Sequence, residues 1–430
     1  MPNQGVNKKR GQDPSYLLNS CFTLRLVVNK NLLLLLVCIF VLMVGFGITL
    51  PVLPYYAERL NSADRVSRET MVVHVSLLTS IYALMQFIFA PLWGKLSDRF
   101  GRKPLLLLGL GGSAIAQVLF GITTSLGMLY LVRGIDGLLS SAALPASTAY
   151  VSDITTERDR SRGMAWFGTA TSLGVVAGPV VGGLSTRRDL HFNVIFRHIE
   201  IDSFSLPFLI SAVLMLIMFF AAKLWLPESL SSQYVSTSTT QSSIRWQNLG
   251  NKLLVLLSLT AIGQLGLAIF EGTFALYAQE QLSYGPVETG LVFMICGLVM
   301  AVLQTVSISF FSRWLCVPSQ IALGFSLMGV ASVLLIIVRT LPYVLSTVGL
   351  LAFGVSLIAP NLSALISKRG GQHTGKALGM QNSANSLGQV GGPALGGMLF
   401  AWQVGAPYLF AGAILIGVGL TLSMTKKLTI

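Results

Sequence analysis

The chain has 430 residues, of which 53% are hydrophobic and 10% are charged. Soluble domains carry about 25% charged residues, so this composition excludes an ordinary soluble protein and indicates a polytopic membrane protein. The formal net charge of +13 does not indicate a nucleic-acid-binding protein, because the basic residues lie in short segments between apolar runs.

Twelve apolar segments are long enough to cross a bilayer, which requires about 20 helical residues. We expect spans over residues 32–54, 71–92, 104–122, 127–151, 164–184, 206–226, 253–277, 286–310, 318–338, 342–366, 378–400 and 406–425. The segments expected in the cytoplasm hold 21 of the 29 Lys and Arg residues, the external segments hold 7, and Arg133 lies within a span. This bias predicts a multi-pass protein of the inner or plasma membrane with both termini in the cytoplasm.

Two segments that lie 214 residues apart share one unusual pattern. Residues 168–184 read GTATSLGVVAGPVVGGL and residues 382–398 read NSANSLGQVGGPALGGM, with Ser-Leu-Gly, Gly-Pro and Gly-Gly in the same register. The repeat predicts two homologous bundles, residues 31–226 and 252–425. Transporters built from repeats bind cargo between them, so the repeat also predicts alternating access.

Polar segments flank the two bundles. We expect cytoplasmic tails at residues 1–30 and 426–430, and a linker at residues 227–251 whose Ser/Thr/Gln composition cannot bury a core. In the external segment 185–203, the alternation in FRHIEID predicts a short strand. This segment is interpreted either as an ordered loop cap or as a lid or partner surface.

The segment between the second and third expected spans reads GKLSDRFGRKP, residues 94–104. Gly94 and Gly101 allow tight reversals, and Asp98 lies between basic residues that include Arg99 and Arg102. A carboxylate in this position can pair with arginine or face a helix N-terminus. A loop that only obeys membrane topology would explain the cations but not the glycines or the acid.

This loop resembles the signature loop of the major facilitator superfamily, and the resemblance runs along the chain from about residue 32. It implies an all-α membrane protein whose 12 transmembrane helices form two pseudo-symmetric six-helix bundles. It also implies that Asp98, Arg99 and Arg102 act as a conformational latch, which stabilises the outward-facing state by contacts across the domain interface. The equivalent loop of the second half, FFSRWLCVPSQ, keeps only Arg313.

The fifth expected span carries a second motif of that superfamily. Its small residues fit the pattern GxxxGPxxGG, which resembles the antiporter signature of drug-efflux members and implies export; they are Gly174, Gly178, Pro179, Gly182 and Gly183. Small residues along one face let helices approach closely, and proline bends a span. Tight packing without directional meaning is the alternative interpretation.

Three ionisable residues, Arg133, Asp136 and Glu271, lie within expected spans, where such groups are costly and often functional. From the helical rise, all three could reach one layer of a central cavity. Arg133 and Asp136 have the i, i+3 spacing of a local ion pair. The resemblance to exporters ties Arg133 to proton coupling, and Asp136 could either tune Arg133 or carry the proton.

Glu271 lies in a stretch that closely resembles the seventh span of quinolone-efflux exporters. There the matching glutamate takes up protons and contacts cationic drugs, which implies the same roles for Glu271. A lone carboxyl group in an apolar span favours its neutral form and could release and regain a proton. A hydrogen bond to a neighbouring helix, with a purely structural role, is the alternative.

The predicted cargo cavity would suit a flat, lipophilic and often cationic compound. Its candidate wall residues, which could instead face lipid or the core, are Met43, Phe46, Gln264, Phe270, Phe274 and Tyr277.

We therefore expect a proton-coupled antiporter that exports small hydrophobic compounds, including cationic ones, or alternatively a proton-driven exporter of one endogenous metabolite or lipid. No GxxxxGK[ST], HExxH or GxSxG motif occurs, so an enzyme is not expected. The four cysteines are scattered and the histidines form no HxxxH pair, so neither a metal nor another cofactor is expected. The expected partners are cargo, protons and the lipid bilayer, but not nucleic acid, and the protein is expected to be a monomer.

Overall fold

A computed structural model describes residues 30–64, 67–156, 159–186, 194–196, 199–201, 204–229, 251–311, 315–370 and 374–424. The expected tails at 1–30 and 426–430, apart from Lys30, most of the expected linker at 227–251, and Arg313 lie outside these residues.

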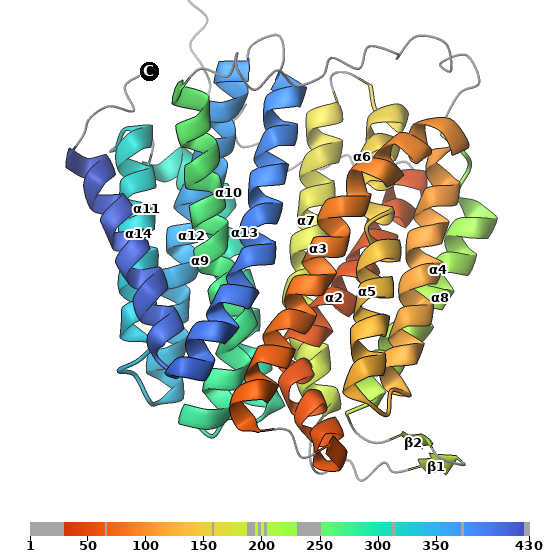
Figure 1. Ribbon diagram of the computed structural model, residues 1–430. Coiled ribbons are helices and arrows are strands. Elements are labelled where there is room, and N and C mark those ends of the chain that lie inside the picture. The colour runs from red at the N-terminus through yellow and green to blue at the C-terminus, as the bar shows by residue number, and fades with distance from the viewer. Residues whose placement is uncertain are drawn as a thin grey trace, which may run out of the picture.

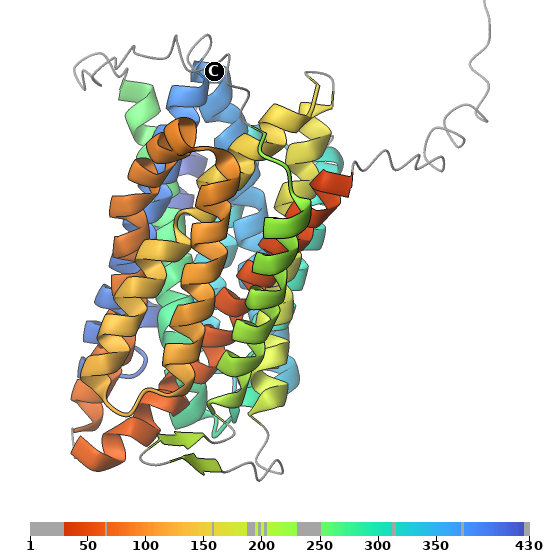
Figure 2. The ribbon, with the colours of Figure 1, turned by 90° about the vertical axis from the view of Figure 1, so that its right-hand side faces the viewer.

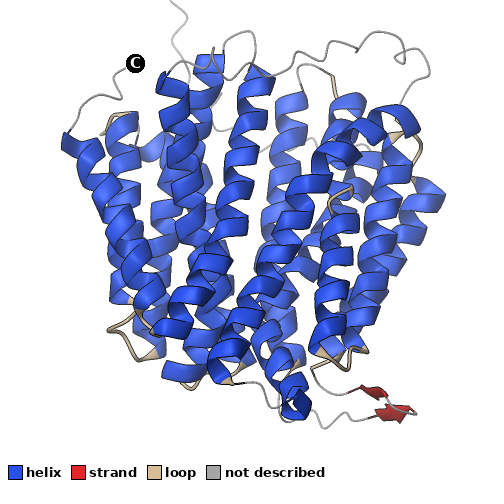
Figure 3. Cartoon of the chain, in the orientation of Figure 1, coloured by secondary structure: helices blue, strands red, loops and turns tan. Residues whose placement is uncertain are grey.

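The described chain is almost entirely helical (Figure 3). The helices of the N-terminal half are α2 (Lys30–Asp64), α3 (Arg68–Phe100), α4 (Arg102–Gly121), α5 (Leu126–Ser140), α6 (Ala143–Ile154), α7 (Arg160–Ser185) and α8 (Leu206–Trp225). Those of the C-terminal half are α9 (Asn251–Gln281), α10 (Pro286–Phe311), α11 (Val317–Leu334), α12 (Leu341–Gly370), α13 (Thr374–Trp402) and α14 (Ala406–Met424).

These helices form the two six-span bundles that the sequence predicts, and they lie side by side in Figure 1. Ten of the described helices are long and apolar enough to span a membrane by themselves. The fourth span is made of two short helices, α5 and α6, and α13 is long but rich in Gly, Ser and Asn. The all-α fold of twelve spans is thus confirmed.

The fourth span differs from the expected single helix over residues 127–151. It is broken at Ser141 and Ala142, between α5 and α6. Pro145 has no backbone N–H, so it cannot donate the helical hydrogen bond to the carbonyl of Ser141. The break lies where this bond is missing, although Pro179 and Pro393 lie within unbroken helices.

Local sequence signals also set other helix ends. The side chains of Ser67 and Ser125 accept hydrogen bonds from the backbone N–H groups of Thr70 and Met128, and so cap α3 and α5. Between α3 and α4 the chain reverses at Gly101, whose φ of +105° is a conformation that glycine adopts readily.

The molecule has two ends along the helix axes (Figures 1 and 2). We call the end where α2 begins and α14 finishes the terminal side. The opposite end, the hairpin side, carries β1 (Val194–Phe196) and β2 (Ile199–Ile201). These strands pair antiparallel, with Val194 opposite Ile201, and β2 confirms the short strand expected within FRHIEID.

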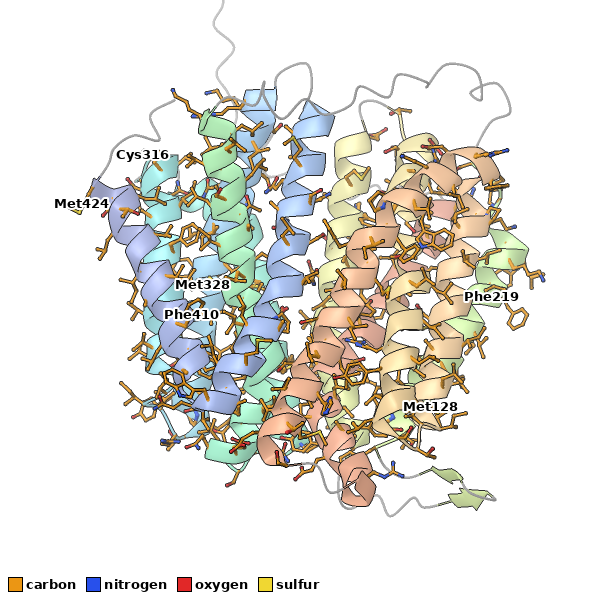
Figure 4. The ribbon with its side chains drawn as sticks, in the orientation of Figure 1. Met128, Phe219, Cys316, Met328, Phe410 and Met424 are labelled. Carbon is orange, nitrogen blue, oxygen red and sulfur yellow. The ribbon has the colours of Figure 1, made fainter. Side chains whose placement is uncertain are left out.

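Large apolar side chains cover the outside of both bundles, as expected for a surface that faces lipid. On α14, Met424 is 83% exposed and Phe410 is 38% exposed, and both are labelled in Figure 4. On α8, Leu224 and Trp225 are more than two-thirds exposed. A soluble protein would rarely leave such large residues together in water.

Both repeats use their glycines in the same way. In the first, glycines of α7 face α2, where a Cβ at Gly178 would lie 2.6 Å from the Cα of Gly47. In the second, glycines of α13 face α9, where a Cβ at Gly392 would lie 2.5 Å from the Cβ of Ala268. The repeat therefore fixes the packing of each half around its first helix.

The two halves are in contact on the hairpin side. Buried apolar residues from the hairpin-side parts of α2, α3 and α5 form one continuous cluster with the core of the C-terminal half. Residues from the terminal-side parts of α2 and α4, together with α8, form a separate cluster. The hydroxyl of Tyr55 on α2 also donates a hydrogen bond of 2.7 Å to the carbonyl of Tyr284 in the C-terminal half.

The terminal side is different. A Cβ at Gly297 of α10 would contact Val176 of α7. Thr169 and Ala165, which lie two and three turns before Val176 on a similar face of α7, are exposed. The structure is thus closed between the halves on the hairpin side and more open on the terminal side.

Candidate functional site

A small cavity lies between the halves and contains Glu271 of α9. Its other walls come from α2, α3, α5 and α9, namely Thr49, Leu50, Leu53, Pro54, Val75, Thr79, Arg133, Gly272 and Ala275. About 10 Å³ is open to the centre of a water molecule, which is close to the minimum for holding one water. We call it the Glu271 cavity.

The Glu271 carboxyl group has only packing contacts among the described residues. No hydrogen bond or ion pair to it occurs within the described ranges of the chain. The next residue, Gly272, lets α13 approach closely, since a Cβ there would lie 2.7 Å from the Cβ of Pro393. The alternative role of Glu271, a structural hydrogen bond between helices, therefore has no support in this conformation.

Arg133 of α5 lies across the same cavity and is 1% exposed. Its Nη1 is 3.6 Å from Oδ2 of Asp136, and its Nε donates to the carbonyl of Leu78 over 3.3 Å. Its guanidinium carbon lies 4.2 Å from the ring centre of Tyr82, a cation–π contact. The i, i+3 ion pair expected from the sequence is thus present in the structure.

Asp136 is 4% exposed and lies behind Arg133, and it is not among the residues that line the Glu271 cavity. Arg133 and Glu271 therefore share one cavity. Asp136 does not line this cavity, but it pairs with Arg133, which does. Sequence reasoning missed Tyr82, whose hydroxyl accepts hydrogen bonds from Gln86 and Ser140 and whose ring covers Arg133. An aromatic residue on an apolar span gives no distinct signal.

Two larger pockets lie on the terminal side of Glu271. The interface pocket, of about 230 Å³, lies between α7 of one half and three helices of the other, and is lined by Thr171, Ser172, Val175, Leu267, Gly297, Met300, Ala301, Val355, Ser356 and Ala359. The amide pocket, of about 250 Å³, lies within the C-terminal half and is lined by Thr260, Gly263, Gln264, Leu267, Met328, Val355, Ile358, Ala359, Leu362, Ser363, Gln381 and Asn385.

The two pockets adjoin, because both are lined by Leu267, Val355 and Ala359. Leu267 lies four residues before Glu271 on α9, which is about one helical turn. A molecule in either pocket would therefore lie close to the Glu271 cavity.

The expected cargo residues divide into two groups. Gln264 lines the amide pocket, and the half-buried ring of Phe46 lies 5.6 Å from that of Tyr82. Met43 is buried where α2 meets Gly174 of α7.

Phe270, Phe274 and Tyr277 lie in the core of the C-terminal half and line none of these three cavities. The Phe270 and Phe274 ring centres are 5.0 Å apart, and the Tyr277 hydroxyl donates to the carbonyl of Leu335 over 3.0 Å. The rings of Phe270 and Phe274 also pack against Phe293 of α10, and the Tyr277 ring packs against Tyr408 of α14, so these three side chains belong to the core of that half.

The antiporter-motif residues contact both a neighbouring helix and the other half. Gly174, Gly178 and Gly182 face α2, whereas a Cβ at Gly183 would lie 2.7 Å from the carbonyl oxygen of Pro286 on α10. The carbonyl of Pro179 likewise lies against Gly290 of α10. The motif thus forms part of the closed hairpin-side interface.

The signature loop lies on the terminal side, with Gly94 near Pro145. Nη1 of Arg102 lies 2.5 Å from Oδ1 of Asp98, and its Nε lies 3.2 Å from Oδ2 of Asp153 on α6. Partial burial lowers the pKa of Arg102, but the two carboxylates outweigh this effect and raise the pKa above its ordinary value. Arg99 is exposed, with its guanidinium carbon 5.5 Å from the ring centre of Phe100.

Sequence reasoning missed Glu228, which binds the start of α4. Its carboxylate accepts hydrogen bonds from the backbone N–H groups of Arg102 (2.8 Å) and Lys103 (3.1 Å). The hydroxyl of the adjacent Ser229 donates to Asp153 over 3.1 Å. Glu228 belongs to the segment interpreted as a linker, and its signal, an acid directly after a span, was hidden by the Ser/Thr/Gln composition that follows it.

Comparison with known proteins agrees with this geometry. Residues 35–369 match the family model of the Major Facilitator Superfamily. The chain is 28% identical to multidrug resistance protein 2 of Bacillus subtilis (strain 168), over 92% of this chain and 95% of that protein. It is 30% identical to the class E tetracycline resistance protein of Escherichia coli, over 87% and 89% of the two chains.

Two further proteins are similar at lower identity. Quinolone resistance protein NorA of Staphylococcus aureus (strain MSSA476) is 24% identical, over 92% of this chain and 96% of that protein. The crystal structure of the human organic anion transporter MFSD10 (TETRAN) superposes with a TM-score of 0.62 at 22% identity, covering 91% of this chain and 98% of that chain. Because its identity to this chain is only 22%, the MFSD10 structure supports the fold alone.

Proposed function

The chain belongs to the major facilitator superfamily, and from this premise we propose that it exports small hydrophobic, drug-like compounds from the cytoplasm by alternating access, in exchange for protons. The relatives named for multidrug, tetracycline and quinolone resistance support this choice of cargo. The protein is a multi-pass membrane protein. We place it in the inner or plasma membrane with the terminal side in the cytoplasm, because the cytoplasmic segments would then hold 21 of the 29 Lys and Arg residues.

The observation that carries the proposal is the setting of Glu271. A carboxyl group with no hydrogen bond or ion pair among the described residues faces a cavity between two moving halves and shares it with Arg133. A group of this kind can exchange a proton when the cavity opens to one side or the other. The Arg133 guanidinium is a partner that could stabilise the Glu271 carboxylate after the proton leaves, and Asp136 holds that guanidinium in the meantime.

The proposed cycle starts from the conformation described above, which is closed on the hairpin side. Cargo enters the interface and amide pockets from the cytoplasm and comes within one helical turn of Glu271, which releases its proton to the cytoplasm. The halves then close on the terminal side and open on the hairpin side. Glu271 takes up an external proton, and the cargo leaves.

The test is uptake of labelled tetracycline and norfloxacin into inverted membrane vesicles under an imposed pH gradient. We expect concentrative uptake that a protonophore abolishes, and no uptake above background in vesicles without the protein. Uptake that ignores the protonophore would remove the antiport mechanism. Proton-driven uptake of an endogenous lipid or metabolite with neither drug transported would favour the alternative, a dedicated metabolite exporter.

A further inference from the structure

The amide pocket brings together three side-chain amides from two helices that are distant in sequence. Gln264 comes from α9, whereas Gln381 and Asn385 lie one turn apart on α13. The other polar lining residues are Thr260 and Ser363, and none of the residues that line this pocket in the described chain is charged. The pocket wall is therefore polar but electrically neutral.

Much of the hydrogen-bonding capacity of these amides is not used by the protein. Gln381 is 5% exposed, and its Nε2 donates one hydrogen bond of 2.8 Å to the hydroxyl of Ser363. Gln264 and Asn385 have no hydrogen bond to another side chain or to the backbone within the described ranges. Each amide offers two N–H donors and a carbonyl acceptor, so the pocket presents several donors and acceptors to a ligand.

Asn361, a nearby buried amide, shows the contrast. It is also 5% exposed, and its Nδ2 donates to Oε1 of Gln320 over 2.9 Å and to the carbonyl of Leu357 over 2.8 Å. Asn361 lines none of the three cavities. Its donors are used within the protein, as is usual for buried amides, whereas the amides of the pocket face open space.

The adjoining interface pocket has a different character. Its larger side chains are apolar, namely Val175, Leu267, Met300 and Val355, and its polar side chains are hydroxyls only, without an amide. Taken together, the two pockets reach the volume typical of a site for a drug-sized molecule. Glu271, the acid nearest along α9, lines a separate cavity, so a cation would find no opposite charge in the amide pocket.

We propose that the amide pocket is a subsite for an uncharged hydrogen-bonding group of the cargo, such as a carboxamide, ketone or hydroxyl, while the interface pocket holds its apolar part. The inference rests on the proposed export function, because it identifies the chemical class of that cargo. Compounds with a neutral polar end would bind through the amides. Lipophilic cations that lack hydrogen-bonding groups would bind without contacting the amides.

The test compares two probes on the purified full-length protein, without a pH gradient. Chloramphenicol carries an amide and two hydroxyls and is neutral, whereas tetraphenylphosphonium is a lipophilic cation without donors or acceptors. Removing one hydrogen bond between chloramphenicol and an amide of the pocket is expected to raise the Kd of chloramphenicol about tenfold. The variants are Gln264→Met and Asn385→Leu, which remove the amide at similar volume, and Gln381→Met, which also loses its bond to Ser363.

We expect the Kd of tetraphenylphosphonium to change less than twofold in all three variants, which also shows that they are folded. The control is Gln389→Met, a change of the same type on α13 at a residue that lines none of the cavities. Equal weakening of both probes, unchanged chloramphenicol binding, or no chloramphenicol binding to the wild-type protein would each overturn the subsite.

Failure of the export function would look different. If the binding pattern holds but the wild-type protein shows no proton-driven uptake in vesicles, the proposed function fails and the subsite stands.

Discussion

Gly183 offers a sharp test of which state the structure represents, because its alanine variant should disfavour the closed hairpin side. A Cβ at this position would lie 2.7 Å from the carbonyl oxygen of Pro286, 3.1 Å from the Cα of Val287 and 3.3 Å from the carbonyl carbon of Pro286. All three atoms are backbone of α10, so no side-chain rotation can relieve the contact. Overpacking of this kind costs about 1 to 3 kcal/mol.

The cost applies only while α7 and α10 touch, so it should move the conformational equilibrium and not the stability of the fold. By the usual conversion, 1.4 kcal/mol is a factor of ten, and the expected shift towards the state open on the hairpin side is about 5- to 150-fold. The matched control is Gly168→Ala on the same helix, where a Cβ would meet no atom within 4 Å. In both variants, replacing glycine by alanine stabilises the helix itself by about 1 kcal/mol. Comparing the two variants cancels this contribution.

Double electron–electron resonance in a cysteine-free background measures the shift. One pair of labels on exposed residues, Thr124 and Gln403, reports the hairpin side, and a second pair, Thr156 and Ser319, reports the terminal side. Gly183→Ala should lengthen the first distance and shorten the second, while Gly168→Ala should change neither. The same shift in both variants, or none in Gly183→Ala, would refute the assignment of a closed hairpin side.

Three other changes test separate parts of the site. Glu271→Gln fills the same volume but cannot cycle a proton, so pH-driven drug uptake should fall to background while drug binding persists; wild-type uptake would make Glu271 structural and move the search to Asp136. Glu228→Ala removes the carboxylate that accepts hydrogen bonds from two backbone N–H groups at the start of α4, and it should lower stability by about 1 kcal/mol, measured by thermal unfolding in detergent. An unchanged Tm would mean that water replaces the carboxylate as acceptor. Asp136→Asn should be destabilising alone, because it leaves buried Arg133 without its charge partner. The double variant Arg133→Ala, Asp136→Ala should recover thermal stability but not pH-driven uptake. Additive losses in both stability and uptake would show that the pair does not interact.

The fold was largely predictable because it depends on features that one segment displays by itself. Apolar length gives the spans, and the shared Gly-Pro and Gly-Gly register gives the two halves. The break of the fourth span was not predictable, because a proline in an apolar run does not by itself end a helix: Pro145 lies next to the break, whereas Pro179 and Pro393 lie within unbroken helices.

The candidate site was predictable only in part, for a physical reason. Glu271 and Arg133 stand out because an ionised group within a span is unusual wherever its side chain points. The aromatic residues at 270, 274 and 277 are ordinary on a span, and their role depends on which face of α9 meets the other half. The amide pocket needs side chains from two helices that are more than 100 residues apart, and Asn385 lies inside the repeat, of which only the shared Ser-Leu-Gly, Gly-Pro and Gly-Gly register was used.

The two halves share a symmetric frame but differ in chemistry, and this difference bears on how cargo and protons could be linked. In each repeat the glycines facing the first helix of the half are followed by one that reaches the other half: Gly183 meets Pro286, and Gly397 meets Ser76. These two contacts lie on opposite interfaces, α7 with α10 and α3 with α13, so one rocking motion about the centre can open or close both. The N-terminal half supplies the ion pair, whereas the C-terminal half supplies the lone acid and the amides. Because Leu267 of the pockets and Glu271 of the small cavity lie one turn apart on α9, and α9 packs along α13, one movement of α9 can change access to both.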